Sequence, residues 1–320
     1  MKQINVAQRM NLPWVESPFF DDLLQKKDIS PQQCQQAIQF NKEGFLLLPQ
    51  AVDHNLIDRT IREIEGEYPA NVGESPARHQ DLWKKYPTVR ALACQPQLIA
   101  VLEMLYGREP IPFQTLNFKF GTQQRAHSDT IHFSSVPVRF MCGVWVALED
   151  TTAQNGPLFY YPRSHRQEEF NYFDIGIEAE ENYAEYPRYE DFIEEFMEAK
   201  GYQRQEIHMK KGDVLIWSSN LIHGGMPITG GNLSRWSQVT HYYFEGCMYY
   251  SPRFSDMFAN NLNLRHVVNI ATGAVVQHSE NGKPIETINT GSFRYAVSHN
   301  FTLPILAKEL FKKMIGRKPF

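Results

Sequence analysis

The sequence predicts a mainly β fold with α-helices: a double-stranded β-helix, that is, a jelly roll or cupin-like barrel, flanked by N-terminal helices. Two observations support this prediction. Apolar residues recur at helical spacing up to about residue 107, and from about residue 111 they alternate with polar ones, which is typical of half-buried strands. These strands follow one another without alternating helices, so a parallel βαβ sheet is not expected.

Three helices are expected in the first part of the chain. The first begins after Ser30, an N-cap residue type that is followed by proline. The second follows Asp53, and the third is PQLIAVLEMLYG, which ends at Gly107. A short buried strand, GFLLLPQ, separates the first two helices, and the polar stretch 73–80 is expected to be a loop.

Alternation predicts the strands that follow. FQTLNFKF alternates apolar and polar side chains, and its polar face carries Asn117 and Lys119. VRFMCGVWVALED also alternates and places Trp145 on the face opposite Val144. Further strands are expected at DVLIWSS and at SRWSQVTHYYFEG.

We expect one domain over residues 1–320, because no internal repeat or low-complexity linker divides the chain. Its expected parts are a helical part at about 30–107, a barrel core at about 111–246 with an insertion at about 166–205, and a C-terminal extension at about 247–320. The insertion is acidic and tyrosine-rich, and a segment of this length is expected to form a lid over the active site. The extension is expected to end in an amphipathic helix, LPILAKELFKKMIG.

Composition excludes several classes of partner. The net charge is −4, so no general attraction to nucleic acid or acidic membranes is expected. No run of 18 apolar residues and no signal-peptide pattern is present, so membrane insertion is not expected. None of the four cysteines forms a C-x-x-C pair, which favours reduced thiols and a cytoplasmic protein.

Three residues are candidate metal ligands. His127 and Asp129 lie two apart in a strand-like segment, so their side chains point the same way. His223 ends an apolar strand and is followed by two glycines. Two histidines and one carboxylate with open coordination positions form the facial triad of non-haem Fe(II) oxygenases, whereas a structural zinc site needs a fourth protein ligand.

A candidate site for an organic acid follows His223. Arg235 and Ser237 lie two apart and share a strand face, and a guanidinium beside a hydroxyl can hold a carboxylate by two contacts. A dicarboxylate held there at one end could chelate iron at the other, as 2-oxoglutarate does.

These motifs resemble the phytanoyl-CoA dioxygenase family of Fe(II)/2-oxoglutarate oxygenases over roughly 29–246. The resemblance is carried by FNKEGFLLLPQAVD, PQLIAVLEMLYG, the His-x-Asp of AHSD, WVALEDTTAQNGPLFYYPRSH, KKGDVLIW, HGG and the trailing arginine.

The resemblance implies a double-stranded β-helix that binds Fe(II), the cosubstrate 2-oxoglutarate and O2. The site residues that it implies are His127, Asp129 and His223 for iron; Arg235 for 2-oxoglutarate; Trp145 lining the pocket; and Asn117, Lys119 and Ser237 as inward-facing candidates for contact with 2-oxoglutarate or substrate. The presence of Asp129 favours hydroxylation, or another oxidation by C–H abstraction, over halogenation.

The expected partner is a small-molecule metabolite. The acidic insertion would repel the phosphates of coenzyme A, so a neutral or cationic substrate is expected. His132 is a candidate for the pocket mouth, and His241 is expected to be a core histidine. Two alternatives remain: a cupin-like metalloenzyme that does not use 2-oxoglutarate, and a barrel that binds a ligand without turnover. The sequence predicts no oligomeric state.

Overall fold

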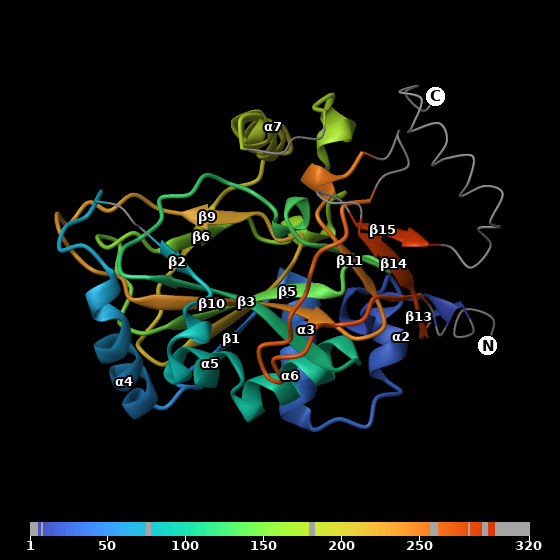
Figure 1. The fold of residues 1–320 in the computed structure, drawn as a ribbon, viewed down its shortest axis with the longest axis horizontal. Helices are drawn as coiled ribbons and strands as arrows, with labels where there is room; N and C mark the ends of the chain where they lie inside the picture. Colours follow the sequence, from blue (N-terminus) through green and yellow to red (C-terminus); the bar gives the residue numbers. More distant parts are fainter. Residues whose placement is uncertain are drawn as a thin grey trace.

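The protein is built from two antiparallel sheets that face each other, with helices on the outer face of the larger one (Figure 1). The computed structural model describes residues 6–7, 9–74, 78–178, 183–256, 262–280, 282–289 and 294–297. The amphipathic helix expected near the C-terminus lies outside the described residues.

The larger sheet has the strand order β1-β8-β5-β10-β3-β2, and the smaller has the order β7-β6-β9. All neighbouring strands in these two sheets are antiparallel. The strands of these sheets are β1 (Phe45–Leu48), β2 (Arg78–Gln80), β3 (Pro110–Phe118), β5 (Met141–Ala147), β6 (Leu158–Tyr160), β7 (Gln205–Ile207), β8 (Val214–Ser218), β9 (His223–Gly225) and β10 (Ser237–Phe244).

The helices are α2 (Phe20–Leu24), α3 (Pro31–Glu43), α4 (His54–Ile64), α5 (Pro87–Ala93), α6 (Pro96–Tyr106) and α7 (Tyr186–Ala199). Short 3-10 turns are η1 (Trp14–Glu16), η2 (Glu65–Glu67), η3 (Leu82–Lys84), η4 (Asp129–Ile131), η5 (Ser164–Arg166), η6 (Tyr172–Ile175) and η7 (Pro252–Phe254).

The expected N-terminal helices are confirmed, and their ends have the expected chemistry. The Ser30 hydroxyl accepts a hydrogen bond from the backbone N–H of Gln33, whose side chain accepts one from the backbone N–H of Ser30. The carboxylate of Asp53 caps α4 by accepting a hydrogen bond from the backbone N–H of Asn55. Gly107 ends α6 with a φ of 70°, a left-handed conformation that glycine adopts without strain.

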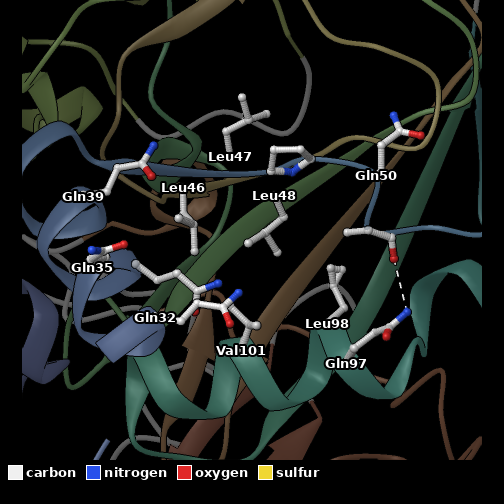
Figure 2. A pocket seen from close by; sticks show the side chains of 13 residues that line it. Gln32, Gln35, Gln39, Leu46, Leu47, Leu48, Gln50, Gln97, Leu98 and Val101 are labelled. Carbon is white, nitrogen blue, oxygen red and sulfur yellow. Dashed lines mark hydrogen bonds between the residues drawn. The ribbon is translucent and has the colours of Figure 1, made fainter. Parts of the chain in front are cut away.

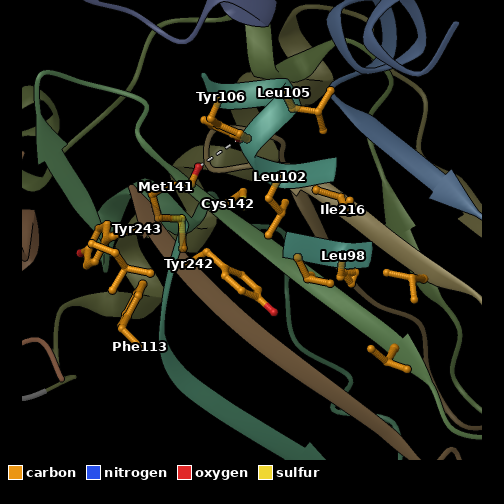
Figure 3. Close-up of a cluster of buried hydrophobic side chains, with 14 of the residues drawn as sticks. Leu98, Leu102, Leu105, Tyr106, Phe113, Met141, Cys142, Ile216, Tyr242 and Tyr243 are labelled. Carbon is orange, nitrogen blue, oxygen red and sulfur yellow. Dashed lines mark hydrogen bonds between the residues drawn. The ribbon is translucent and has the colours of Figure 1, made fainter. Parts of the chain in front are cut away.

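The outer face of the larger sheet packs against α6 and its neighbours. Figure 3 shows Leu98 and Leu102 of α6 beside Cys142 and Ile216 of the sheet. The Tyr242 hydroxyl donates to the backbone carbonyl of Ala93 at 2.7 Å, so this buried polar group has a partner. Because successive side chains of a strand point to opposite faces, the other residues of these strands point to the inner face of the sheet.

The elements that the sequence did not predict include β2 and α5. β2 lies within the stretch 73–80, where we expected a loop, and pairs with the edge of β3. Its residues are largely exposed and polar, so they show no apolar alternation. α5 is only two turns long and was missed because so short a segment carries little periodicity.

The insertion 166–205 lies on the side of the molecule opposite α3 to α6 (Figure 1). Tyr189, Ile193 and Met197 of α7 are buried and pack with Ile131 and Phe159. Part of its acidic surface is paired, because Arg125 forms ion pairs with both Asp191 and Glu194.

The C-terminal extension forms a separate two-stranded sheet with an earlier segment of the chain. β11 (Met248–Tyr250) pairs with β4 (Ser134–Val136), and the Arg265 N–H donates to the Tyr249 carbonyl at 2.9 Å. The remaining short strands are β12 (Ser279–Glu280), β13 (Lys283–Pro284), β14 (Glu286–Asn289) and β15 (Arg294–Val297).

No helix among the described residues has the length and apolar character needed to cross a membrane.

Glu16 is a buried carboxylic acid whose ionisation opposes folding. Its side chain is 1% exposed, accepts from the Ser218 hydroxyl at 3.0 Å and lies 3.3 Å from Arg139. Burial raises its pKa from 4.5 to about 7, although Arg139 opposes the shift. The group therefore stabilises the fold most at low pH, and this contribution is lost as pH rises through 7.

We predict that Glu16→Gln becomes more stable relative to wild type by about 1–3 kcal/mol between pH 5 and pH 8, because glutamine never ionises. Urea unfolding at both pH values measures this difference. The exposed Glu65→Gln is the control and should show no such trend. A stability difference for Glu16→Gln that is equal at both pH values would contradict the assigned ionisation.

Candidate active site

A reciprocal pair of backbone hydrogen bonds joins the two candidate histidines. The His127 N–H donates to the His223 carbonyl at 3.0 Å, and the His223 N–H donates to the His127 carbonyl at 3.1 Å. This bridge connects the segment before η4 with β9, although they are far apart in the sequence. It brings the two imidazole rings to a centroid separation of 4.6 Å.

Asp129 completes the cluster from the first residue of η4. Ser128 precedes it and caps this turn, because the Ser128 hydroxyl accepts from the backbone N–H of Thr130. One possible ligand atom from each of His127, Asp129 and His223 lies within 4.8 Å of the others. The structure thus brings together the three residues that the sequence nominated.

The hydrogen bonds of the two histidines select one ring tautomer. Nδ1 of His127 lies 2.9 Å from the Arg125 carbonyl, and Nδ1 of His223 lies 2.9 Å from the Leu221 carbonyl. Because a carbonyl only accepts, each Nδ1 carries the proton and each Nε2 keeps its lone pair. Burial, followed by the nearby His223, lowers the pKa of His127 to about 4, so this imidazole is neutral near pH 7.

Trp217 orients the carboxylate of the cluster. Its indole Nε1–H donates to Oδ2 of Asp129 at 2.8 Å, which leaves Oδ1 available to a metal. The indole lies over Gly143, where an added Cβ would be 2.2 Å from the ring. Sequence reasoning did not identify either role, because Trp217, Asp129 and Gly143 lie in separate elements, β8, η4 and β5.

The residues fit an Fe(II) ion. Two imidazoles whose Nδ1 atoms lie on backbone carbonyls, together with one oriented carboxylate oxygen, match the donor set of a facial triad. The side-chain amide nitrogen of Gln124 lies 3.2 Å from Nε2 of His127, a contact that is consistent with Nε2 as the acceptor.

Arg235 is a fully enclosed cation. It is 1% exposed, its Nη1 donates to the Gly156 carbonyl at 2.6 Å, and its Cζ lies 5.2 Å from the centre of the Trp145 ring. Its Nε is buried and has no hydrogen-bond partner among the described residues. Burial lowers the pKa of Arg235 to about 10, so the guanidinium is still charged at neutral pH. An enclosed cation with an unused donor fits an anionic ligand.

The prediction that Asn117 and Lys119 of the β3 segment face the cavity is wrong. The cavity is lined by Gln114, Leu116 and Phe118, whereas Asn117 points away and donates to the side chain of Gln238 at 3.0 Å. The Lys119 ammonium donates to the Pro69 carbonyl and is likewise not in the cavity wall. Both faces of β3 are buried, so polarity alone did not tell which face meets the cavity.

The other sequence candidates lie near the cluster. Trp145 and His132 line the cavity, and Nε2 of His132 is 3.1 Å from the Tyr186 hydroxyl. His241 also lines it, with Nε2 3.9 Å from Oδ2 of Asp129, so it is more than a core histidine. The Ser237 hydroxyl is buried without a hydrogen-bond partner among the described residues, and Ser237 is not in the cavity wall.

The cavity between the sheets has a volume of about 780 Å³, a size that suits a small-molecule ligand. Its wall also contains side chains that sequence reasoning did not select, notably Trp217, Arg78, Arg253 and Arg265. The two last arginines belong to the C-terminal extension, where the sequence offered no motif.

A second hollow, of about 410 Å³, lies between α3, β1 and α6 (Figure 2). It is lined by leucines and by glutamines such as Gln35 and Gln97, and the latter donates to the Ala51 carbonyl. It has no titratable side chain in its wall. The cavity between the sheets is therefore the candidate active site.

Comparison with known proteins gives a family match. The model of the phytanoyl-CoA dioxygenase (PhyH) family matches residues 40–236, which is more than half of the chain. A mouse protein described as phytanoyl-CoA dioxygenase domain-containing protein 1 is 30% identical over 83 residues, which are 25% of this chain and 28% of that protein. The match thus spans less than a third of this curated relative's length.

Solved structures with the same fold are known. The epimerase SnoN from nogalamycin biosynthesis, in complex with Fe3+, alpha ketoglutarate and nogalamycin RO, has a TM-score of 0.54 and 18% identity, covering 82% of this chain and 97% of that one. EctD from S. alaskensis, with 2-oxoglutarate and 5-hydroxyectoine, has a TM-score of 0.51 and 22% identity, covering 68% of this chain and 76% of that one. These similarities and the facing antiparallel sheets confirm the expected jelly-roll fold.

We predict that Trp217→Phe weakens Fe(II) binding by about 10- to 100-fold, because Asp129 loses the donor that orients it. Anaerobic calorimetry with Fe(II) measures this change. Trp83→Phe is the matched control, since the Trp83 indole donates to Asp81 at 3.2 Å away from the cavity wall. Equal affinities in wild type and Trp217→Phe would show that the indole does not orient the carboxylate.

We predict that Gly143→Ala lowers the free energy of unfolding by about 1–3 kcal/mol and also weakens Fe(II) binding, because the new methyl group must displace the Trp217 ring. Urea unfolding and anaerobic calorimetry test both parts. Gly66→Ala is the control, since a Cβ there meets nothing within 4 Å. The steric account is contradicted if Gly143→Ala behaves like Gly66→Ala.

Proposed function

The chain belongs to the phytanoyl-CoA dioxygenase family, and we propose that it is an Fe(II)- and 2-oxoglutarate-dependent dioxygenase that oxidises a C–H bond of a small-molecule metabolite. The observation that carries this proposal is one cavity that holds both required sites. A triad of His127, Asp129 and His223 lies in the same wall as Arg235, an enclosed cation with an unused donor.

His127 and His223 would hold iron through Nε2, and Asp129 through Oδ1. Iron bound with 2-oxoglutarate supplies the oxidation of an unactivated C–H bond by O2. Hydrogen bonds orient these ligand atoms before the metal binds. Backbone carbonyls fix the tautomers of the two imidazoles, and the Trp217 indole fixes the orientation of the carboxylate. The ligand atoms therefore need little rearrangement when the metal binds.

Arg235 would hold the carboxylate of 2-oxoglutarate that is remote from iron. Its guanidinium remains charged at neutral pH and is kept in place by the Gly156 carbonyl and the Trp145 ring. We assign the Ser237 hydroxyl to the same task although Ser237 is outside the cavity wall, because it shares a face of β10 with Val239 and His241, which line the cavity, and is buried without a partner in the described part of the chain. Asn117 and Lys119 have no place in this proposal.

The insertion 166–205 would cover the substrate and limit the entry of water. Tyr183, Tyr186 and Glu190 contribute to the cavity wall. A covered site protects the reaction from competing proton and electron donors. Hydroxylation is the expected outcome, with other oxidations by C–H abstraction open to the same ligand set.

A small molecule is the supported substrate class. The names of the solved relatives specify nogalamycin RO for SnoN and 5-hydroxyectoine for EctD, both small compounds. The sequence also predicted a neutral or cationic substrate, from the acidity of the insertion. That prediction loses its basis where Asp191 and Glu194 are paired with Arg125.

Arg235 favours this proposal over its two alternatives. A cupin-like metalloenzyme without 2-oxoglutarate would have no use for a buried guanidinium, which is costly to enclose without an anion. A barrel that binds a ligand without turnover would have no need for two imidazoles held in a ligating tautomer.

We predict that anaerobic addition of Fe(II) and then 2-oxoglutarate produces the visible metal-to-ligand charge-transfer band of chelated 2-oxoglutarate. His127→Ala should abolish the band, and Arg235→Ala should shift its half-saturation to about tenfold or more higher 2-oxoglutarate, because a charged hydrogen-bonding partner is lost. Absorbance titration measures both effects.

The control variants are His54→Ala and Arg204→Ala, whose side chains lie outside the cavity wall and should leave the titration unchanged. Iron binding without any band would reject the 2-oxoglutarate assignment and favour the metalloenzyme alternative. A band without oxygen uptake for any substrate would favour the binding barrel.

A further inference from the structure

We propose that the substrate carries an anionic oxygen group, a carboxylate or a phosphate, and that Arg265 and Arg253 bind it. This inference rests on the proposed function, because it assigns the substrate end of the same cavity. Both arginines come from the C-terminal extension, which lies beyond the family match at residues 40–236.

Arg265 is held by aromatic rings and one hydroxyl. Its guanidinium carbon lies 4.6 Å from the centre of the Phe133 ring and 5.6 Å from that of Phe113, and its Nη1 donates to the Ser251 hydroxyl at 2.9 Å. Its Nε is buried without a hydrogen-bond partner, and no carboxylate forms an ion pair with it in the described part of the chain. A cation placed like this has donors left for a ligand.

Arg253 lies between two rings and is 2% exposed. Its guanidinium carbon is 3.4 Å from the centre of the Tyr183 ring and 4.1 Å from that of Phe254. The rings hold the guanidinium plane in one orientation and keep water from its faces. A planar guanidinium fixed in this way can bind a carboxylate or phosphate by two parallel hydrogen bonds.

The backbone of the extension makes this end of the cavity rigid. The Ser251 N–H donates to the Asn263 carbonyl at 3.0 Å, and the Arg265 N–H donates to the Tyr249 carbonyl at 2.9 Å. These bonds link the segment that carries Arg253 to the one that carries Arg265. The two guanidinium groups are therefore positioned before a ligand arrives, which reduces the entropy lost on binding.

The two arginines occupy a different end of the cavity from Arg235. Phe133, which contacts Arg265, lies 4.7 Å from the His241 ring, and Nε2 of His241 is 3.9 Å from Asp129. Arg235 lies two residues before β10 and six residues before His241, a separation of up to about 20 Å in an extended chain. A small molecule held at Arg265 would thus approach the triad from the side opposite to 2-oxoglutarate.

The charges in the cavity wall leave a place for a further anion. Among the described residues, four arginines line it, Arg78, Arg235, Arg253 and Arg265, against two carboxylates, Asp129 and Glu190. Bound Fe(II) and the 2-oxoglutarate dianion cancel each other in formal charge. Even when Arg253 is left out of this sum, three arginines face two carboxylates in the described wall, so its formal charge stays positive, which favours an anionic substrate and disfavours a cationic one.

We predict that the Fe(II)- and 2-oxoglutarate-loaded protein binds anionic small molecules in preference to their neutral and cationic counterparts. The probes are matched sets of arylalkyl compounds that differ only in the head group: a carboxylate, a phosphate monoester, a neutral amide and an amine. Binding is measured anaerobically by calorimetry and by the shift of the charge-transfer band. The best anion should bind at least about tenfold more tightly than its amide.

Arg265→Gln and Arg253→Gln should each abolish this preference, and Arg265→Lys should retain part of it because it keeps the charge. Both glutamine variants should keep the charge-transfer band and the wild-type affinity for 2-oxoglutarate, which also shows that they fold. Arg204→Gln is the matched control, since its guanidinium contacts the Phe159 ring at 5.5 Å and lies outside the cavity wall.

The outcomes separate this inference from the proposed function. Absence of the band in wild type rejects the proposed function, whatever the head-group preference. A normal band with amides or amines bound as tightly as anions, or with no anion bound, overturns the inference alone. An anion preference that persists in both glutamine variants also overturns it, because the anion is then held elsewhere. The relative affinities of the carboxylate and the phosphate identify which group the site takes.

Discussion

The site depends on one backbone contact, the reciprocal pair of hydrogen bonds between His127 and His223. It connects the irregular segment after β3 to the smaller sheet, so both imidazoles are placed by main-chain geometry. Each ring then uses its Nδ1 on a carbonyl two residues back along its own segment. Ring orientation and tautomer are thus local properties, and only the bridge has to be formed over a long sequence separation.

The two faces of the larger sheet carry different tasks. Its outer face is apolar and is covered by helices, whereas its inner face presents Trp145, Trp217 and His241 to the cavity. Because strand side chains alternate, the position that buries Ile216 under the helices also directs Trp217 at Asp129. Gly143 opposite it leaves the room that the indole needs. Core packing on one face therefore fixes the orientation of a metal ligand on the other.

The sequence predicted features whose signal is local, and it failed for strands that are buried on both faces. Ser30 and Asp53 predicted helix starts because a cap involves only the next three residues. The His-x-Asp spacing nominated two members of the triad for the same reason. The inward face of β3 was assigned wrongly, because Asn117 is fully buried beside Gln238, so both faces of the strand are enclosed. Trp217 could not be assigned, since its partner lies 88 residues away.

The charge preference of the cavity also could not be predicted from one segment of the sequence. The acidic insertion suggested an anion-repelling lid, but acidity along a sequence does not tell which side chains meet the ligand. In the fold, Asp191 and Glu194 engage Arg125, while the arginines of the cavity wall come from well-separated segments. Arg78 is on an edge strand, Arg235 precedes β10, and Arg265 belongs to the extension. Because electrostatic preference is set by the groups that share the low-dielectric cavity, substrate charge follows from this assembled wall rather than from any one segment.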